Sequence, residues 1–209
     1  MGSIIGIDAP HKQFPTIVSR NKHLFQEIAP LKIIDIGAGH GRFLRFFTGL
    51  AHRWRRSGQE FCEKIDVDID EYICIEPYKK FADRLRRTAL VCKLQLGIDV
   101  SVVQDTWENV RDEFIKERFD VVILWDVVMF MDLRHVHGVS SPLEAVLREV
   151  PVWCNMTKHY LLFSLHPVKR ALIHRQDFKT ILSAFEERCK VVDKRYYNRI
   201  YKPRDFAVT

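Results

Sequence analysis

Three closely spaced glycines after an apolar run form the part of this chain best suited to chemistry. The segment reads KIIDIGAGHG and places Asp35 before Gly37, Ala38, Gly39, His40 and Gly41. Glycine permits positive φ angles and lets a ligand approach the bare backbone. The phenylalanine-rich stretch that follows predicts a helix, whose first amides are unpaired and carry partial positive charge. The sequence therefore predicts a turn that holds a ligand with oxygen acceptors.

The spacing of these glycines separates two kinds of nucleotide-binding turn. A dinucleotide-binding fingerprint, G-x-G-x-x-G, has its third glycine three positions after the second, and that position here is Arg42. The third glycine comes one residue earlier, at Gly41, so that with Asp35 the pattern is D-x-G-x-G-x-G. This pattern resembles the first motif of the class I S-adenosylmethionine-dependent methyltransferases. The resemblance covers residues 31–167 and a C-terminal hairpin.

The resemblance implies S-adenosylmethionine as the cofactor and S-adenosylhomocysteine as its product. Asp35 would take up positive charge from the amino acid end of the cofactor, directly or through water. Glu76 stands where the family has an acid that accepts hydrogen bonds from both ribose hydroxyls, and Asp105 where it often has a carboxylate or amide against the adenine amino group. The cofactor-binding residues expected on this basis are Asp35, Gly37, Ala38, Gly39, His40, Gly41, Glu76, Pro77, Asp105, Thr106, Trp107, Trp125 and Asp126.

The position of Glu76 departs from the usual pattern. It lies about twice as far from Asp35 as the roughly 20 residues usual for a ribose-binding acid. We therefore expect an insertion at residues 50–70, between the first helix and the second strand. The insertion ends in alternating aliphatic and acidic residues that permit a strand, and then Asp70 or Glu71 would compete with Glu76. We prefer Glu76, because the apolar run YICI directly precedes it and a proline follows it.

Arg55 and Arg56 support a rival interpretation, an NADP-dependent oxidoreductase. They lie about 20 residues after Asp35, where an arginine can accept the 2′-phosphate of NADP. However, the segment AHRWRRSG follows no strand and continues a helical pattern, so we interpret these arginines as a solvated helix end. We expect an enzyme of the EC 2.1.1 class. The main alternative is a methyltransferase-like binding or scaffold protein without catalytic activity, and the oxidoreductase ranks below it.

Asp126 is the best catalytic candidate. It follows the fourth predicted strand, where it and Trp125 would face the methionine end and the substrate, and a carboxylate there can orient or deprotonate a nucleophile. His166, after the fifth strand, is a second candidate base. His135 and His137 form an H-x-H pair, which without a third ligand is more typical of a solvated loop. We therefore expect no metal.

The acceptor of the methyl group stays open between RNA, protein and a small molecule. The residues DVVM stand where methylases of exocyclic amines carry N-P-P-[YF] or D-P-P-Y, and no Pro-Cys pair for cytosine-carbon methylation exists. Basic residues cluster at 52–56, 79–87 and 193–204, the last among tyrosines. Such clusters suit RNA through phosphate contacts and stacking, although basic helices and charged edge strands are also ordinary surface features.

The elements that must position these residues follow the pattern of parallel strands joined by crossover helices. Short apolar runs predict strands at residues 32–36, 72–75, 100–103, 120–124 and 160–164. Helices are expected at 79–96, from a capped start at Ser141-Pro142-Leu143-Glu144, and at 175–188, with a short helix near 18–28. The C-terminal segment VVDKRYYNRIYKPRDFAVT predicts a hairpin. We expect an α/β fold with a doubly wound, mostly parallel seven-stranded sheet, helices on both faces and an antiparallel C-terminal hairpin.

Composition limits the remaining alternatives. A chain of 209 residues, 47% of them hydrophobic, fits one domain at residues 1–209 with an N-terminal arm at 1–30. The net charge of +6 permits an anionic partner. Five scattered cysteines, none in a CxxC pair, indicate reduced thiols. With no secretory signal and no apolar run of about 18 residues, we expect a cytoplasmic protein without a membrane partner.

Overall fold

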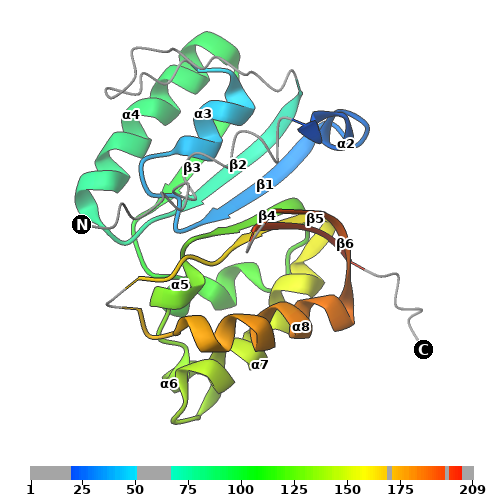
Figure 1. Ribbon diagram of the computed structural model, residues 1–209. Coiled ribbons are helices and arrows are strands. Elements are labelled where there is room, and N and C mark those ends of the chain that lie inside the picture. Colours follow the sequence, from blue (N-terminus) through cyan, green and yellow to red (C-terminus); the bar gives the residue numbers. More distant parts are fainter. Residues whose placement is uncertain (1–19, 51–66, 169–170, 196–197, 204–209) are drawn as a thin grey trace, which may run out of the picture.

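The computed structural model describes residues 20–50, 67–168, 171–195 and 198–203 (Figure 1). Within these residues the strands form a seven-stranded sheet in the order β3-β2-β1-β4-β5-β7-β6. The strands are β1 (Leu31–Ile36), β2 (Ile69–Ile75), β3 (Asp99–Val103), β4 (Phe119–Trp125), β5 (Thr157–Ser164), β6 (Cys189–Arg195) and β7 (Asn198–Pro203). The first five strands pair in parallel, and β7 is antiparallel to both of its neighbours. The expected fold is confirmed.

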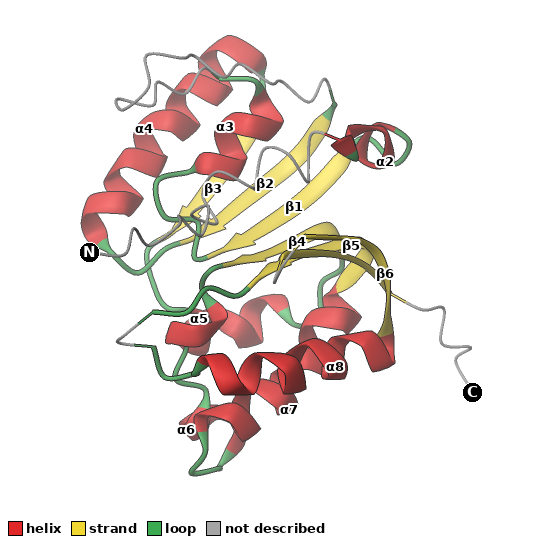
Figure 2. Ribbon diagram, in the orientation of Figure 1, coloured by secondary structure: helices red, strands yellow, loops and turns green. Residues whose placement is uncertain are grey.

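The central strand β4 explains why the sheet is covered on both faces. Its sequence FDVVILW is buried at every position, as expected for a strand of a parallel sheet between two helical layers. Figure 2 shows α3 and α4 on one side of the sheet and α5, α7 and α8 on the other. The helices are α2 (Lys22–Gln26), α3 (Arg42–Thr48), α4 (Lys79–Leu96), α5 (Trp107–Phe114), α6 (Arg134–His137), α7 (Pro142–Met156) and α8 (Phe178–Arg188).

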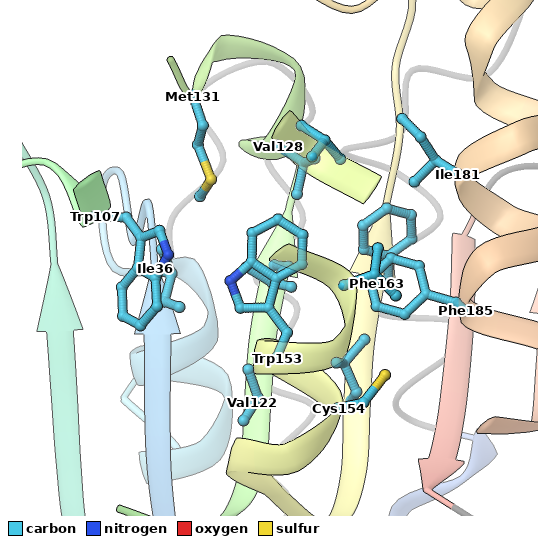
Figure 3. Packing of buried hydrophobic residues seen from close by; sticks show 14 of the residues in the cluster. Ile36, Trp107, Val122, Val128, Met131, Trp153, Cys154, Phe163, Ile181 and Phe185 are labelled. Carbon is cyan, nitrogen blue, oxygen red and sulfur yellow. The ribbon is translucent and has the colours of Figure 1, made fainter. Parts of the chain in front are cut away.

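Two hydrophobic cores follow from this layering. The larger lies between the sheet and helices α5, α7 and α8, and Figure 3 shows Trp153, Phe163 and Phe185 packed within it. The rings of Phe163 and Phe185 have centroids 4.5 Å apart, and Trp153 stacks on Phe185 at 6.2 Å. The smaller core lies on the α3 and α4 side. Burial of each large side chain contributes roughly 1.5–3 kcal/mol, so both helical layers are firmly attached to the sheet.

The predicted helices are present, with some changes at their ends. The helix at 79–96 has its predicted bounds in α4, and the short helix near 18–28 is α2. The helix predicted at 175–188 begins as a 3₁₀ turn, Arg175–Asp177, before α8. At the start of α7, the Ser141 hydroxyl accepts the Glu144 amide at 3.3 Å. The Glu144 carboxylate does not complete a capping box but accepts from Arg148 at 2.6 Å, because the exposed guanidinium one turn later offers a charged partner.

Several predictions lie wholly or mostly outside the described residues. Of the expected insertion at 50–70, residues 51–66 are not described, and neither is most of the N-terminal arm, so the division of the chain into these parts stays a prediction. Cys62 falls in the same stretch, whereas Cys74, Cys92, Cys154 and Cys189 are buried thiols that form no disulfide. None of the described helices has the length and apolar character required to cross a membrane.

Candidate functional site

The glycine turn lies at the point where the strand order reverses. Strand β1 is flanked by β2 on one side and β4 on the other. From β2 the chain continues to β3, farther from β1 on the first side, and from β4 it continues to β5, farther from β1 on the second side. A crevice at the carboxyl ends of the strands is the usual ligand site of such sheets. The amides of Gly37 and Ala38 donate to the Ile75 carbonyl oxygen at 2.8 and 3.1 Å. These two hydrogen bonds fasten the turn to the end of β2.

The three glycines of the turn have positive φ angles of +75° at Gly37, +56° at Gly39 and +71° at Gly41. A Cβ atom on Gly37 would lie 2.3 Å from Cγ2 of Val127, and one on Gly41 would lie 2.7 Å from Cδ2 of Leu85. A Cβ atom on Gly39 would meet only the Gly37 carbonyl oxygen, at 3.9 Å. Packing against Val127 therefore excludes a side chain at Gly37, whereas one at Gly41 would require the end of the Leu85 side chain to move, and among the described residues no atom lies as close to a Cβ at Gly39.

Glu76 is the acid that the fold brings to this turn. Its side chain is only 3% exposed, and its Oε2 accepts the Gly39 amide at 2.7 Å while Oε1 accepts the Tyr78 amide at 2.9 Å. Asp70 and Glu71 lie in the first half of β2, and Glu71 pairs with Lys32 at 2.9 Å. Of the three competing acids, Glu76 alone lies beside the glycine turn. Pro77 follows it and is exposed.

Asp35 is buried directly beneath the turn, near the end of β1. Its Oδ2 accepts the hydroxyl of Tyr72 at 3.1 Å. The pKa of Asp35 is raised to about 7, chiefly by burial; the Tyr72 hydrogen bond opposes this increase, and the nearby charge of Glu76 adds to it. This carboxyl group is therefore close to half ionised at neutral pH, and a positive charge placed beside it favours the ionised form.

The residues after β3 separate into two environments. Oδ1 of Asp105 accepts the Thr106 amide and the Asn109 side chain, both at 2.7 Å. The Asn109 hydrogen bond and then the Thr106 amide lower the pKa of Asp105. Trp107 instead points into the larger core (Figure 3), where its indole N–H donates to Oε1 of Glu149 at 3.0 Å. Asp105 and Thr106 stay at the edge of the sheet, and the Trp107 side chain serves packing.

Asp126 has an unusual backbone at the end of β4. Its φ of +55° is the one positive value at a non-glycine among the described residues, a conformation that costs about 1–2 kcal/mol. The Ser164 hydroxyl donates to Oδ1 of Asp126 at 2.5 Å. The charge of Asp126 also raises the pKa of Arg42, against a larger lowering by burial. The neighbouring Trp125 is buried, with its ring 5.4 Å from that of Phe43.

The histidines considered from the sequence lie in separate places. His166 is partly exposed after β5. His135 and His137 do not lie in a solvated loop, as the sequence suggested, but in the short helix α6. Nε2 of His137 lies 2.7 Å from Oε2 of the fully buried Glu149, which draws the ring inward. Within the described residues no group of three or more histidine, cysteine or acidic side chains could hold a metal ion.

Some residues that shape the crevice were missed from the sequence. Ser164 and Tyr72 contact the two aspartates only because neighbouring strands place them there. The strand-end position of Ser164 was an available signal. His40 was expected among the cofactor-binding residues, but its contacts were not: its ring lies 4.0 Å from that of Phe81, and its Nδ1 lies 3.1 Å from Nη1 of Arg84.

Comparisons with known proteins agree with this description at the level of fold. Neither a family model nor a curated protein matches the sequence. Magnesium protoporphyrin IX methyltransferase (ChlM) from Synechocystis PCC 6803, solved with bound SAM, has 16% identity and a TM-score of 0.52, over 97% of this chain and 85% of that one. The 16S rRNA methylase ArmA has 13% identity and a TM-score of 0.53, over 94% and 87%.

A third similar structure is a putative rRNA methylase from Clostridium thermocellum, with 10% identity and a TM-score of 0.56 over 97% of this chain and all of that one. Identities this low establish likeness of fold alone. The chain has the fold of the class I S-adenosylmethionine-dependent methyltransferases.

Proposed function

We propose that this protein is an S-adenosylmethionine-dependent methyltransferase. The observation that carries the proposal is the buried carboxylate of Glu76, held by the Gly39 and Tyr78 amides at the carboxyl end of β2. Each oxygen of a carboxylate has two lone pairs, so each can accept one further hydrogen bond. The arrangement suits a vicinal diol such as that of ribose.

The residues around Glu76 fit the remaining parts of the cofactor. Asp35, with its raised pKa, gains ionisation when a cationic ammonium lies near it. Open space beside Gly39 leaves room for a ligand against the backbone. Asp105 and Thr106 lie at the end of β3, next along the sheet from Glu76, where adenine would be held. When bound, the cofactor supplies a methyl group already activated on a sulfonium.

Asp126 would orient the acceptor of the methyl group. The Ser164 hydroxyl donates to one of its oxygens, and its left-handed backbone fixes the direction of the side chain. A carboxylate held in this way can position an acceptor hydroxyl or amine, and can take its proton, without a metal. Proper alignment for in-line displacement then depends on the rigidity of the ends of β4 and β5.

Sheet topology favours this function over an NADP-dependent oxidoreductase. Dinucleotide-binding domains have the strand order 3-2-1-4-5-6, whereas this sheet ends in an antiparallel pair with β7 beside β5. Arg55 and Arg56, on which the oxidoreductase interpretation rested, lie outside the described residues.

Calorimetric titration tests the cofactor. We expect S-adenosylmethionine and S-adenosylhomocysteine to bind at micromolar affinity, and Glu76→Gln to weaken both by roughly 10- to 100-fold, the value of one or two charge-assisted hydrogen bonds. Glu71→Gln, at the other end of the same strand, is the matched control and should change affinity less than about twofold. Binding of NADPH with no response to either methyl compound would refute the proposal.

Transfer of a labelled methyl group tests catalysis. The protein is incubated with methyl-labelled S-adenosylmethionine and with RNA, protein and small-molecule fractions of a cell extract. Label in one fraction, reduced in Asp126→Ala by more than any loss of cofactor affinity explains, is the expected result. Cofactor binding with no label in any fraction would instead indicate the methyltransferase-like binding protein.

A further inference from the structure

A second concave surface lies between helices α3 and α4, which are neighbours on one face of the sheet (Figure 1). This groove, here called the arginine groove, has a volume of about 650 Å³. Its lining residues are Arg45, Leu50, Arg84, Arg87, Thr88 and Val91. Half of them carry a guanidinium and none is acidic. The surface therefore differs from the crevice, whose polar groups are mainly carboxylates and backbone amides.

Helical spacing explains why the arginines face one groove. Arg87 and Thr88 follow Arg84 by three and four residues, and Val91 follows them by four and three, so these four residues share one side of α4. From α3, Nη2 of Arg45 lies 3.4 Å from the Thr88 hydroxyl. Arg84 contacts the His40 ring, and Nε of Arg87 donates to the Asp83 carbonyl oxygen at 3.3 Å. In the described chain neither Arg84 nor Arg87 has a carboxylate within salt-bridge distance.

The acidic side chains near α4 neutralise other cations. Asp83 pairs with Lys79 at 2.8 Å and with Arg86 at 3.0 Å, and Asp99 pairs with Lys93 at 2.8 Å. Arg86 also donates to the Gln104 side chain at 3.0 Å. Arg86 and Arg87 are therefore adjacent residues of equal charge, one bound to an acid outside the groove and the other lining it.

Nearby positive charges add to burial in lowering the pKa values of two side chains. Burial lowers the pKa of His40, and Arg84, Arg42, Arg45 and Lys80 lower it further in that order. The pKa of Arg45 is lowered by burial and then by Arg84. Like charges held this close create a field that attracts an anion.

Aromatic rings continue from the groove toward the crevice. The ring of His40 lies 4.0 Å from that of Phe81, and Phe81 lies 5.9 Å from Tyr78. Tyr78 is 70% exposed, and the contacts of Arg84 with His40, of His40 with Phe81 and of Phe81 with Tyr78 connect this exposed ring to the groove. Guanidinium groups bind phosphate in a bidentate manner, and exposed aromatic rings stack on unpaired bases. Arginines in a concave surface next to such a ring suit a flexible polyanion with bases better than a flat lipid surface.

We propose that the arginine groove binds the phosphodiester backbone of a single-stranded nucleic acid and that Tyr78 stacks on a base of it. The proposal goes beyond the proposed function, since this binding requires neither cofactor nor methyl transfer. Because His40 belongs to the glycine turn and contacts Arg84, a strand in the groove reaches the edge of the crevice.

Fluorescence anisotropy with labelled single-stranded RNA and DNA of about 20 nucleotides tests the proposal. Both should bind, with affinity falling as sodium chloride rises from about 50 to 200 mM. Arg87→Glu should weaken binding at least about tenfold, and Arg87→Ala should reduce the slope of log affinity against log salt by about 0.7, the value of one phosphate contact. Tyr78→Ala should weaken binding by roughly 5- to 100-fold, equivalent to about 1–3 kcal/mol of stacking.

Arg86→Glu is the matched control, with the same change of charge one residue away, and should lower affinity less than about threefold at physiological salt because Arg86 does not line the groove and its charge reaches a bound phosphate only through screening solvent. Thermal unfolding and S-adenosylhomocysteine titration of each variant establish that the fold and the crevice are intact. Equal losses in the Arg86 and Arg87 variants would overturn the assignment to the groove. So would binding to phosphatidylserine vesicles or polyglutamate with no binding to either nucleic acid. Failure of cofactor binding alone leaves these results unaffected.

Discussion

Gly37, Gly39 and Gly41 share a left-handed backbone but differ in what surrounds them. Val127 and Leu85 occupy the space where side chains on the outer two would lie, whereas the space at Gly39 is open. Among the described residues nothing but its φ angle disfavours a side chain at the middle position, where the proposed ligand would lie. An alanine at Gly37 is therefore expected to affect mainly folding, and an alanine at Gly39 mainly ligand binding.

Gly39→Ala should therefore impair binding more than folding. We expect a loss of about 1–2 kcal/mol in the free energy of unfolding, the cost of a left-handed alanine, and at least about a tenfold loss of S-adenosylmethionine affinity. Gly37→Ala adds a clash with Val127 and should lose about 2–5 kcal/mol of stability. Urea unfolding and calorimetry measure the two effects. Wild-type affinity in a folded Gly39→Ala variant would show that no ligand approaches this backbone.

Asp35 makes a pH-dependent contribution to stability with a sign opposite to that of most acids. Its pKa in the folded protein is about 7, above the ordinary 3.8, so the folded state holds a proton that the unfolded state has lost between these values. Stability from this group is present below about pH 4 and is lost as the pH rises through 7. Asp35→Asn removes the dependence and keeps an acceptor for the Tyr72 hydroxyl.

We expect Asp35→Asn to be more stable than the wild type by about 2–4 kcal/mol at pH 8, with the difference shrinking toward pH 4. Urea unfolding at a series of pH values measures the difference. A gap that stays constant with pH would mean that the Asp35 carboxyl has an ordinary pKa in the folded protein.

At the scale of elements, Glu149 joins three helices. From α7 its carboxylate accepts the Trp107 indole and the Arg111 guanidinium of α5, at 3.0 and 3.2 Å, and lies 2.7 Å from His137 of α6. The carboxylate is fully buried and Arg111 is nearly so. The start of α5, and with it the loop that carries Asp105, is thus fixed by a group on a distant part of the chain.

Glu149→Leu should destabilise the protein by about 3–5 kcal/mol, because it leaves the buried indole N–H of Trp107 without an acceptor and removes the carboxylate that Arg111 and His137 contact, although Arg111 keeps its pair with Asp112 at 2.6 Å. Glu144→Leu, which breaks an exposed pair with Arg148 on the same helix, should cost about 0.5 kcal/mol or less. Urea unfolding at neutral pH compares the two variants. Similar losses in both would contradict a structural role for the buried network.

At the scale of the whole molecule, the residues of the candidate site come together only because β1 lies between β2 and β4. Residues from four segments, around positions 37–41, 76, 105 and 126, meet at one edge of the sheet. A ligand that contacts several of these segments binds the folded state and has no comparable site in the unfolded chain. Its binding energy therefore adds to global stability.

S-adenosylhomocysteine at about 100 times its Kd should add about 2.7 kcal/mol to the free energy of unfolding. For a chain of this length this corresponds to a rise of roughly 5–10 °C in Tm. Differential scanning fluorimetry with NADPH as the comparison ligand measures the shift. A rise with NADPH and none with S-adenosylhomocysteine would point back to a dinucleotide site.

The sequence by itself was sufficient for features that depend on neighbouring residues. The glycine turn, the apolar strands and the bounds of α4 follow from local backbone preferences and from the period of buried side chains. The order of acids along the chain then suggested the class of fold. Element ends were less accessible: β2 begins at Ile69 rather than at 72, because its pairing with β1 extends the strand beyond its apolar core.

Tertiary structure decided questions that involve residues far apart in the chain. It placed Glu76, and neither Asp70 nor Glu71, at the glycine turn, since strand direction determines which end of β2 meets the end of β1. It turned the Trp107 ring toward Glu149 and put Arg87 in a groove while Arg86 paired with Asp83. Such contacts depend on the register and packing of separate elements, so they cannot be predicted from the residues that are neighbours in the sequence.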